Sequence, residues 1–160
     1  MNDLHVRIAV TADAEAIVRT HHEAVWNTAR NHYSPDVLEA WAVKLADSSY
    51  EQVRREILDV ELVVLVAESL SRVAGFGMIV PADKELRAVY PAFGRQGVGA
   101  AILGRLEQIA RQRGVTRLDL SSSINAEAFY AKHGYEVVER TTLRLRSGCE
   151  MACVRMTKNL

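Results

Sequence analysis

A strand-like segment that runs through a glycine-containing turn into a helix is the feature that most restricts the fold of this chain. Residues 84–90 alternate between polar and more apolar side chains, as a half-buried strand does. After the turn at 94–99, apolar side chains recur at helical spacing until Gly114, a residue typical of helix C-termini. A strand and a helix joined this closely pack against each other, so the segment predicts a mixed α/β fold.

The rest of the chain supplies further segments of both kinds, without a linker or repeat. Ser34 and Pro35 predict a helix start, with Ser as the N-cap and Pro in the first helical position. β-branched runs separated by residues 69–71 predict a hairpin. We expect residues 1–160 to form one domain, a mixed sheet with helices packed on it. The other expected elements are a strand at 4–10, a helix at 13–30, a short helix after 48, a strand at 117–120, a short helix at 125–134 and two closing strands.

The composition argues against several classes of protein. The 20 Lys and Arg residues balance the 20 Asp and Glu residues, so no strong field favours nucleic acid or an anionic membrane. The longest apolar run, 62–67, is far shorter than the ~20 residues of a membrane-spanning helix, and the N-terminus lacks a secretory-signal pattern. Cys149 and Cys153 have no His or Cys cluster that would complete a metal site. These observations predict a cytoplasmic protein with reduced cysteines and no metal.

The turn at 94–99 has the chemistry of a phosphate-binding loop. The helix that follows it begins with unpaired backbone N–H groups and the positive end of the helix dipole. Gly97 and Gly99 lack a Cβ, which lets the backbone approach an anion closely. A dinucleotide-binding motif would need glycine at Ile102, and a P-loop would need Lys and Ser or Thr where Ala100-Ala101 stand. A tight strand-to-helix connection without a ligand is the alternative that stays open.

Two motifs make the sequence resemble the GNAT acetyltransferase superfamily. Residues 89–100 resemble the family's acetyl-CoA motif, a strand ending in Val-x-Pro, then an aromatic residue and Gln/Arg-x-x-Gly-x-Gly/Ala. Residues 125–135 resemble its second motif, Asn-x-x-Ala-x-x-Phe-Tyr-x-x-x-Gly-Phe, with a spacing one residue tighter. The resemblance covers nearly the whole chain. It implies a GNAT-like α/β (α+β) fold with a mixed, mostly antiparallel sheet of six to seven strands flanked by helices, in the order β-α-α-β-β-β-α-β-α-β-β.

The resemblance also implies acetyl-CoA as the cosubstrate, with no metal. Gly94 stands where the family usually has Gln or Arg, which shifts the expected pyrophosphate contacts to backbone N–H groups. The pantetheine arm is expected beside the strand ending at Val89, and Asn125 is expected either to cap its helix or to hold the pantetheine. The expected cofactor-binding residues are Val89, Gly94, Arg95, Gln96, Gly97, Val98, Gly99, Ala100 and Asn125.

Acetyl transfer to an amine needs an acid and a base. By the resemblance, Tyr130 is expected to protonate the leaving CoA thiolate, because a phenol with a pKa of about 10 stays protonated at neutral pH. A plain core position is the alternative for Tyr130. Glu85 is the expected base, directly or through a water, and an exposed ion pair with Arg87 is its alternative. The other candidate bases, in the first helix, are His21, His22 and Glu23.

The family builds its acceptor pocket from the helical segment at 26–41. The expected substrate-binding residues are His22, Trp26 and Tyr33. The expected reaction is direct transfer, in a ternary complex, to a primary amine of a small molecule or peptide. No nucleic-acid or membrane partner is expected, and a homodimer is left open. An inactive acyl-CoA-binding or regulatory module and a structural domain without a cofactor stay open as alternatives.

Overall fold

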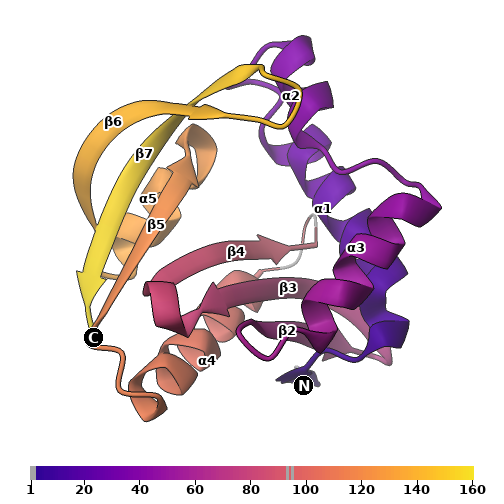
Figure 1. Cartoon of the computed structure of the whole chain (residues 1–160), viewed down its shortest axis with the longest axis vertical. Coiled ribbons are helices and arrows are strands. Elements are labelled where there is room, and N and C mark those ends of the chain that lie inside the picture. The colour runs from indigo at the N-terminus through magenta and orange to yellow at the C-terminus, as the bar shows by residue number, and fades with distance from the viewer. Residues whose placement is uncertain (1–2, 93, 95) are drawn as a thin grey trace.

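The computed structural model describes residues 3–92, 94 and 96–160 (Figure 1). The strands are β1 (Leu4–Ile8), β2 (Val63–Ser69), β3 (Arg72–Val80), β4 (Glu85–Pro91), β5 (Arg117–Ser123), β6 (Glu136–Arg144) and β7 (Glu150–Asn159). The helices are α1 (Ala14–Thr28), α2 (Pro35–Trp41), α3 (Asp47–Leu58), α4 (Val98–Gln112) and α5 (Glu127–Lys132), and the short 3-10 turns are η1 (Thr11–Asp13), η2 (Pro81–Asp83) and η3 (Ile124–Ala126). Within the described ranges, no helix has the length and apolar character needed to cross a membrane.

In the described part of the chain, the strands form a seven-stranded sheet in the order β1-β2-β3-β4-β5-β7-β6. Neighbouring strands are antiparallel except for β4 and β5, which run parallel. The helix α3 is the short third helix expected before the hairpin. The predicted mixed, mostly antiparallel sheet flanked by helices is therefore confirmed.

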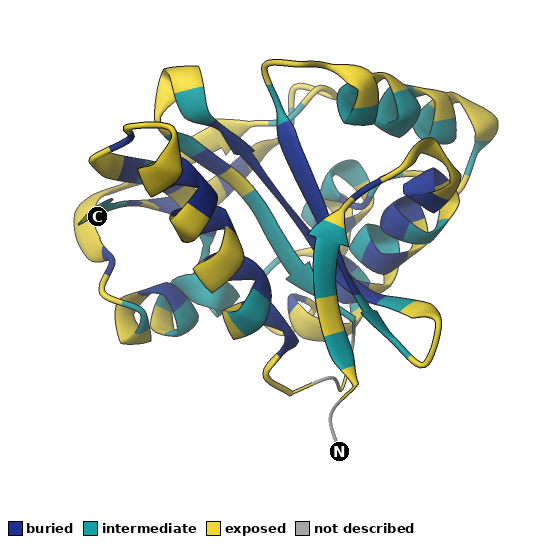
Figure 2. Ribbon diagram, turned by 90° about the horizontal axis from the view of Figure 1, so that it is seen from below, coloured by how far each residue is buried: buried dark blue, intermediate teal, exposed yellow. Residues whose placement is uncertain are grey.

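The strand β2 shows why the sheet is covered on both faces. Val63 and Leu65 belong to the apolar cluster that includes α4, whereas Val64 and Val66 belong to a cluster with Ile17 of α1 and with α3. A strand that buries both faces is apolar at consecutive positions, which explains the unbroken run in this part of the sequence. The buried residues accordingly lie between the helices and the sheet (Figure 2).

Two glycines of β3 bring α4 directly onto the sheet. A Cβ added to Gly77 would lie 2.5 Å from Ile102 Cγ2, and one added to Gly75 would lie 2.7 Å from Val98 Cγ1. These distances are shorter than real Cβ contacts, so the first turns of α4 pack against the β3 backbone. This packing fixes the N-terminus of α4 next to the end of β4.

The parallel strands β4 and β5 separate almost at once. They share one registered pair, Glu85 with Asp119, and the Asp119 N–H donates to the Lys84 carbonyl at 2.8 Å. On its other side, β4 pairs with β3 through an irregularity between Met78 and Ile79. Beyond Glu85, the side of β4 that faces β5 has no strand partner among the described residues, and the two strands diverge (Figure 1).

Candidate active site

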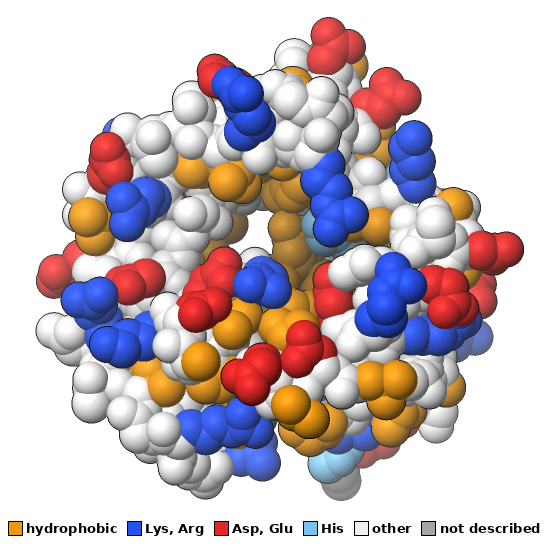
Figure 3. Space-filling model, in the orientation of Figure 1, with side chains coloured by type: hydrophobic (Ala, Val, Ile, Leu, Met, Phe, Trp, Pro, Cys, Tyr) orange, Lys and Arg blue, Asp and Glu red, His pale blue; other side chains and the backbone are white. Residues whose placement is uncertain are grey.

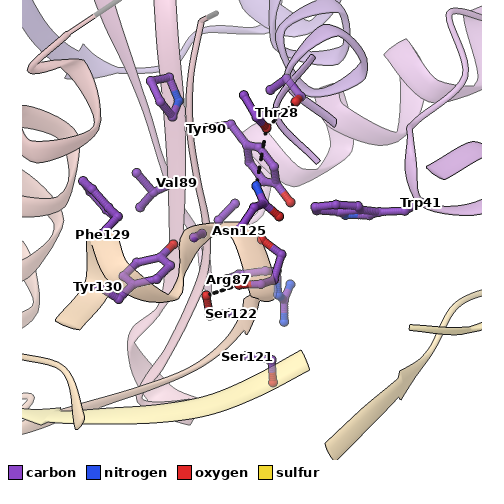
Figure 4. A pocket seen from close by; sticks show the side chains of 15 residues that line it. Thr28, Trp41, Arg87, Val89, Tyr90, Ser121, Ser122, Asn125, Phe129 and Tyr130 are labelled. Carbon is purple, nitrogen blue, oxygen red and sulfur yellow. Dashed lines mark hydrogen bonds between the residues drawn. The ribbon is translucent and has the colours of Figure 1, made fainter. Parts of the chain in front are cut away.

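A cavity of about 250 Å³ lies where β4 and β5 diverge. Figure 3 shows the surface hollowed at this place, with apolar side chains in its depth and charged ones around its rim. The walls come from α1, α2, β4, β5, η3 and α5, so the cavity joins segments that are far apart in the sequence (Figure 4). The side chains used below are Thr28, Trp41, Arg87, Val89, Tyr90, Ser121, Ser122, Asn125, Phe129 and Tyr130.

Tyr130, the predicted general acid, lines this cavity. Its buried ring packs edge-to-face on Phe129 and on Tyr135, with ring centroids 5.2 and 5.7 Å apart. Figure 4 shows its hydroxyl turned toward β4. Burial, assisted by the nearby Tyr90, raises the pKa of Tyr130 above that of a free phenol. The hydroxyl is therefore protonated at neutral pH, as a proton donor must be.

Asn125 does not cap a helix, so that sequence-based alternative is wrong. It lies in η3, and α5 begins after Ala126 without a side-chain cap. Its Nδ2 donates to Thr28 Oγ1 at 3.5 Å (Figure 4), and Thr28 Oγ1 donates in turn to the Ala24 carbonyl. The Oδ1 atom of Asn125 is buried and has no hydrogen-bond partner among the described residues. A buried acceptor without a donor is costly, so this oxygen can accept a further hydrogen bond.

The N-terminus of α4 leaves its backbone N–H groups available. Gly97 is the N-cap with φ 79°, and no side chain of the described residues caps the helix. The Ala101 N–H is bonded to the Gly97 carbonyl, and the N–H groups of residues 97–100 have no backbone partner among the described residues, as expected for the first turn of a helix. Gly94 also has a positive φ, 75°, and a Cβ at Gly94 or Gly97 would meet nothing within 4 Å. These two glycines serve the backbone conformation, and no atom of the described part of the chain fills the space beside them.

Gly99 also has a packing role. It lies inside α4, and a Cβ there would be 3.3 Å from the Phe129 ring and 3.7 Å from Pro91. Its small size therefore lets α4 pack against two residues that line the cavity. Val98 is buried in the core, so only its backbone can face a ligand. Gln96 and Ala100 are exposed, and Arg95 lies outside the described residues.

Glu85, the predicted base, lies at the edge of the site. Its carboxylate accepts a hydrogen bond from the Arg87 guanidinium at 2.9 Å, and both side chains are almost half exposed. Arg87 lines the cavity, whereas Glu85 does not. The ion pair that was the alternative for Glu85 is therefore present in the structure.

The structure does not bring the three predicted acceptor residues together at the cavity. The Tyr33 hydroxyl donates to the Ala152 carbonyl at 2.7 Å and accepts from the Ile124 N–H at 2.8 Å, so it ties the α1–α2 connection to β7 and η3. His22 Nδ1 bonds to the Val43 carbonyl at 2.9 Å. Trp26 packs against the small apolar cluster around Val25 and Leu38.

Other residues line the cavity without having been predicted there. Trp41 comes from α2 and Tyr90 from β4, and burial raises the pKa of Tyr90 to about 12. The serines at 121–123 form a hydroxyl-rich wall on β5, the only long run of serines in the sequence. The serine run is evident in the sequence, but it lines a cavity only because β4 and β5 separate. Sequence spacing does not reveal that separation.

The comparisons with known proteins agree with this geometry. Residues 29–160 match the family model described as the acetyltransferase (GNAT) domain. The chain is 25% identical over 146 residues to the uncharacterized N-acetyltransferase YafP of Escherichia coli (strain K12), an overlap that covers 91% of this chain and 90% of that protein.

Solved structures are similar over the full length. A GCN5-related N-acetyltransferase from Rhodopseudomonas palustris has a TM-score of 0.86 and 25% identity, covering 100% of this chain and 98% of its own. The PaiA N-acetyltransferase from Thermoplasma acidophilum, solved with coenzyme A, has a TM-score of 0.78 and 19% identity, covering 99% of both chains. The chain therefore belongs to the GNAT acetyltransferase family and is an N-acetyltransferase, as its two sequence motifs predicted.

Proposed function

We propose that this protein binds acetyl-CoA in the cavity between β4 and β5 and transfers the acetyl group directly to a primary amine of a small molecule or peptide. One observation carries the proposal. The cavity holds a protonated phenol, Tyr130, and a buried amide oxygen without a partner, Asn125 Oδ1, close to the uncapped N-terminus of α4.

The binding of acetyl-CoA would use backbone and side-chain groups in separate places. The unpaired N–H groups of residues 97–100 suit the pyrophosphate, because a helix N-terminus attracts anions. The free side of β4 near Val89 suits the amide groups of the pantetheine, which can pair with a strand edge as another strand would. Asn125 Oδ1 then accepts an N–H group from the ligand, which removes the unpaired acceptor.

The chemical step requires a proton for the sulfur that leaves. When the amine attacks the thioester carbonyl, the C–N bond forms and the C–S bond breaks, and the departing thiolate takes the Tyr130 proton. Tyr130 is protonated at neutral pH, because burial raises its pKa above that of a free phenol, so its hydroxyl carries the proton that the thiolate needs. The family's carboxylate position falls on Glu85, and its partner Arg87 reaches the cavity, so we propose that Glu85 takes the amine proton through a water molecule.

Two measurements test this proposal. Acetyl-CoA at 100 times its dissociation constant should increase the free energy of unfolding by roughly 2.7 kcal/mol. No thermal shift at millimolar acetyl-CoA would contradict the binding. Release of CoA with a panel of primary amines then separates an active enzyme from an inactive acyl-CoA-binding module, which would show the shift but no release.

A further inference from the structure

A second cavity, of about 200 Å³, lies on the other side of β4 from β5, under α1 and α3. Three residues of β4 line both cavities: Arg87, Ala88 and Tyr90. The two cavities therefore share part of one wall, the segment of β4 that carries these residues. A group that occupied it would lie beside the reacting centre rather than on a remote surface.

The walls of the second cavity are predominantly apolar. They include Ile17 and Val18 from α1, Val53 from α3, and Phe76 and Met78 from β3. The Phe76 ring stacks on the Tyr90 ring, with centroids 5.4 Å apart and planes 18° apart. Such walls bind aromatic or branched aliphatic groups, because burial of apolar surface is favourable and non-directional.

The histidine in the wall of this cavity, His21, is uncharged at neutral pH. His21 Nδ1 accepts a hydrogen bond from the Val43 N–H at 3.3 Å, which fixes the ring in place. The ring also packs on Tyr90, with centroids 4.5 Å apart. Burial, assisted by the neighbouring His22, lowers the pKa of His21 to about 4, so the imidazole stays neutral beside an apolar ligand.

The charges around the second cavity limit the kind of amine it can accept. Among the described residues, its lining includes one carboxylate, Glu56, whose Oε1 accepts from Gln52 Nε2 at 3.0 Å, and one guanidinium, Arg87. A polyamine or aminoglycoside brings several ammonium groups, and each would have to leave water. One carboxylate in the lining cannot compensate for that cost, and the Arg87 guanidinium, which Glu85 pairs, adds no negative charge.

We infer that the second cavity is the acceptor subsite for the apolar part of a primary monoamine, such as an arylalkyl or branched alkyl amine. The inference rests on the proposed acetyl transfer and specifies its substrate class. The amine nitrogen reaches past Ala88 to the first cavity, while the apolar group stays between α1, α3 and β3.

The test compares 2-phenylethylamine and isoamylamine with spermidine and kanamycin as acceptors, by CoA release. We expect kcat/KM to be at least ~10-fold higher for the two apolar amines, because transfer of their apolar group from water into the cavity is favourable. Equal or better kcat/KM with spermidine or kanamycin would overturn the inference.

Variants of α3 test the location of the subsite. Val53→Asp places a charge in the cavity and should raise the KM for 2-phenylethylamine at least ~10-fold without changing the KM for acetyl-CoA. Leu58→Asp adds the same charge to the same helix at an exposed position outside the cavity and should leave both constants unchanged. Val53→Phe fills the cavity without adding a charge and should raise the KM for 2-phenylethylamine in the same way. It replaces Val53→Asp in the test if the aspartate variant does not fold.

The same protein samples distinguish a failure of the acceptor subsite from a failure of acetyl-CoA binding. In one outcome, acetyl-CoA stabilises the protein but both Val53 variants keep the wild-type KM for 2-phenylethylamine. This outcome would overturn the subsite and leave acetyl-CoA binding intact. Absence of acetyl-CoA stabilisation in the wild-type protein would overturn both.

Discussion

Asn125 Nδ2 donates to Thr28 Oγ1 across the first cavity, and the buried Oδ1 of Asn125 has no hydrogen-bond partner in the part of the chain that the structure describes. The two residues are 97 positions apart in the sequence and come from α1 and η3. The contact therefore sets the direction of the amide through a long-range connection.

Asn125→Ala should weaken acetyl-CoA binding and leave the fold intact. Loss of one hydrogen bond predicts a roughly 3- to 10-fold higher dissociation constant. Loss of a helix cap would lower the free energy of unfolding by ~1 kcal/mol. Removal of the Asn125 side chain should cost less than that, because in the free protein the substitution also removes a buried acceptor without a described partner. Calorimetric titration and urea unfolding measure both quantities. A less stable protein with unchanged affinity would assign Asn125 a structural role.

Thr28 gives a matched pair of variants for the same contact. Thr28→Ser keeps the hydroxyl that orients the Asn125 amide, and Thr28→Val removes it at similar volume. We expect weaker acetyl-CoA binding only for Thr28→Val, measured by the same titration. Equal affinities for the two variants would mean that the contact does not position Asn125.

A negative charge at the start of α4 should abolish acetyl-CoA binding. Gly97 has a positive φ, which Asn and Asp tolerate better than other residues, so Gly97→Asn and Gly97→Asp differ mainly in charge. We expect Gly97→Asp to eliminate the thermal shift with acetyl-CoA and Gly97→Asn to retain part of it. Gly104→Asp, at an exposed position in the same helix, should retain the full shift. Retained binding by Gly97→Asp would contradict a pyrophosphate site there.

Tyr33→Phe should destabilise the protein, because the hydroxyl satisfies two backbone groups. Its loss leaves the Ile124 N–H and the Ala152 carbonyl without this partner, at a cost of about 1–3 kcal/mol. Tyr50→Phe is the control, since the structure gives the Tyr50 hydroxyl no hydrogen bond to another described residue. Urea titration measures both free energies of unfolding. Equal values for the two variants would argue against a stabilising role of the Tyr33 hydroxyl between η3 and β7.

The lowered pKa of the half-buried His21 predicts that the free energy of unfolding declines in mild acid. Its pKa falls from 6.5 to about 4 on folding, so between these values the unfolded chain binds more protons than the folded one. The free energy of unfolding should therefore decrease as the pH falls from 6.5 toward 4, by up to roughly 3 kcal/mol from this residue. His21→Asn should flatten that decline, and His32→Asn, at an exposed position, should not. Parallel slopes for His21→Asn and the wild type would exclude the effect.

The sequence predicted most of the fold because local chemistry determined the elements. Ser34 caps α2 as expected, with its Oγ accepting from the Val37 N–H. The glycine turn and α4 follow β4 as the motif indicated, and Tyr130 lies in the cavity. These features depend on residues that are neighbours in the sequence, so spacing was sufficient.

The parts of the site that spacing missed depend on long-range packing. Tyr33 was expected to bind the acceptor, but its hydroxyl is held by β7 and η3, far along the chain. The second cavity needs α3, β3 and β4 together, and no motif marks Val53 or Phe76. The packing of Gly99 against Phe129 joins two helices that are distant in the sequence, so the motif that predicted Gly99 as a phosphate-loop residue did not reveal this contact.

The most direct test of the account is acetyl transfer by Tyr130→Phe. The substitution keeps the buried ring and its packing on Phe129 and Tyr135 and removes only the hydroxyl. We expect kcat, measured by CoA release with an accepted amine, to fall by about 10²-fold or more, with the dissociation constant for acetyl-CoA unchanged. Wild-type turnover in Tyr130→Phe would contradict the assignment of this phenol as the acid that protonates the leaving thiolate.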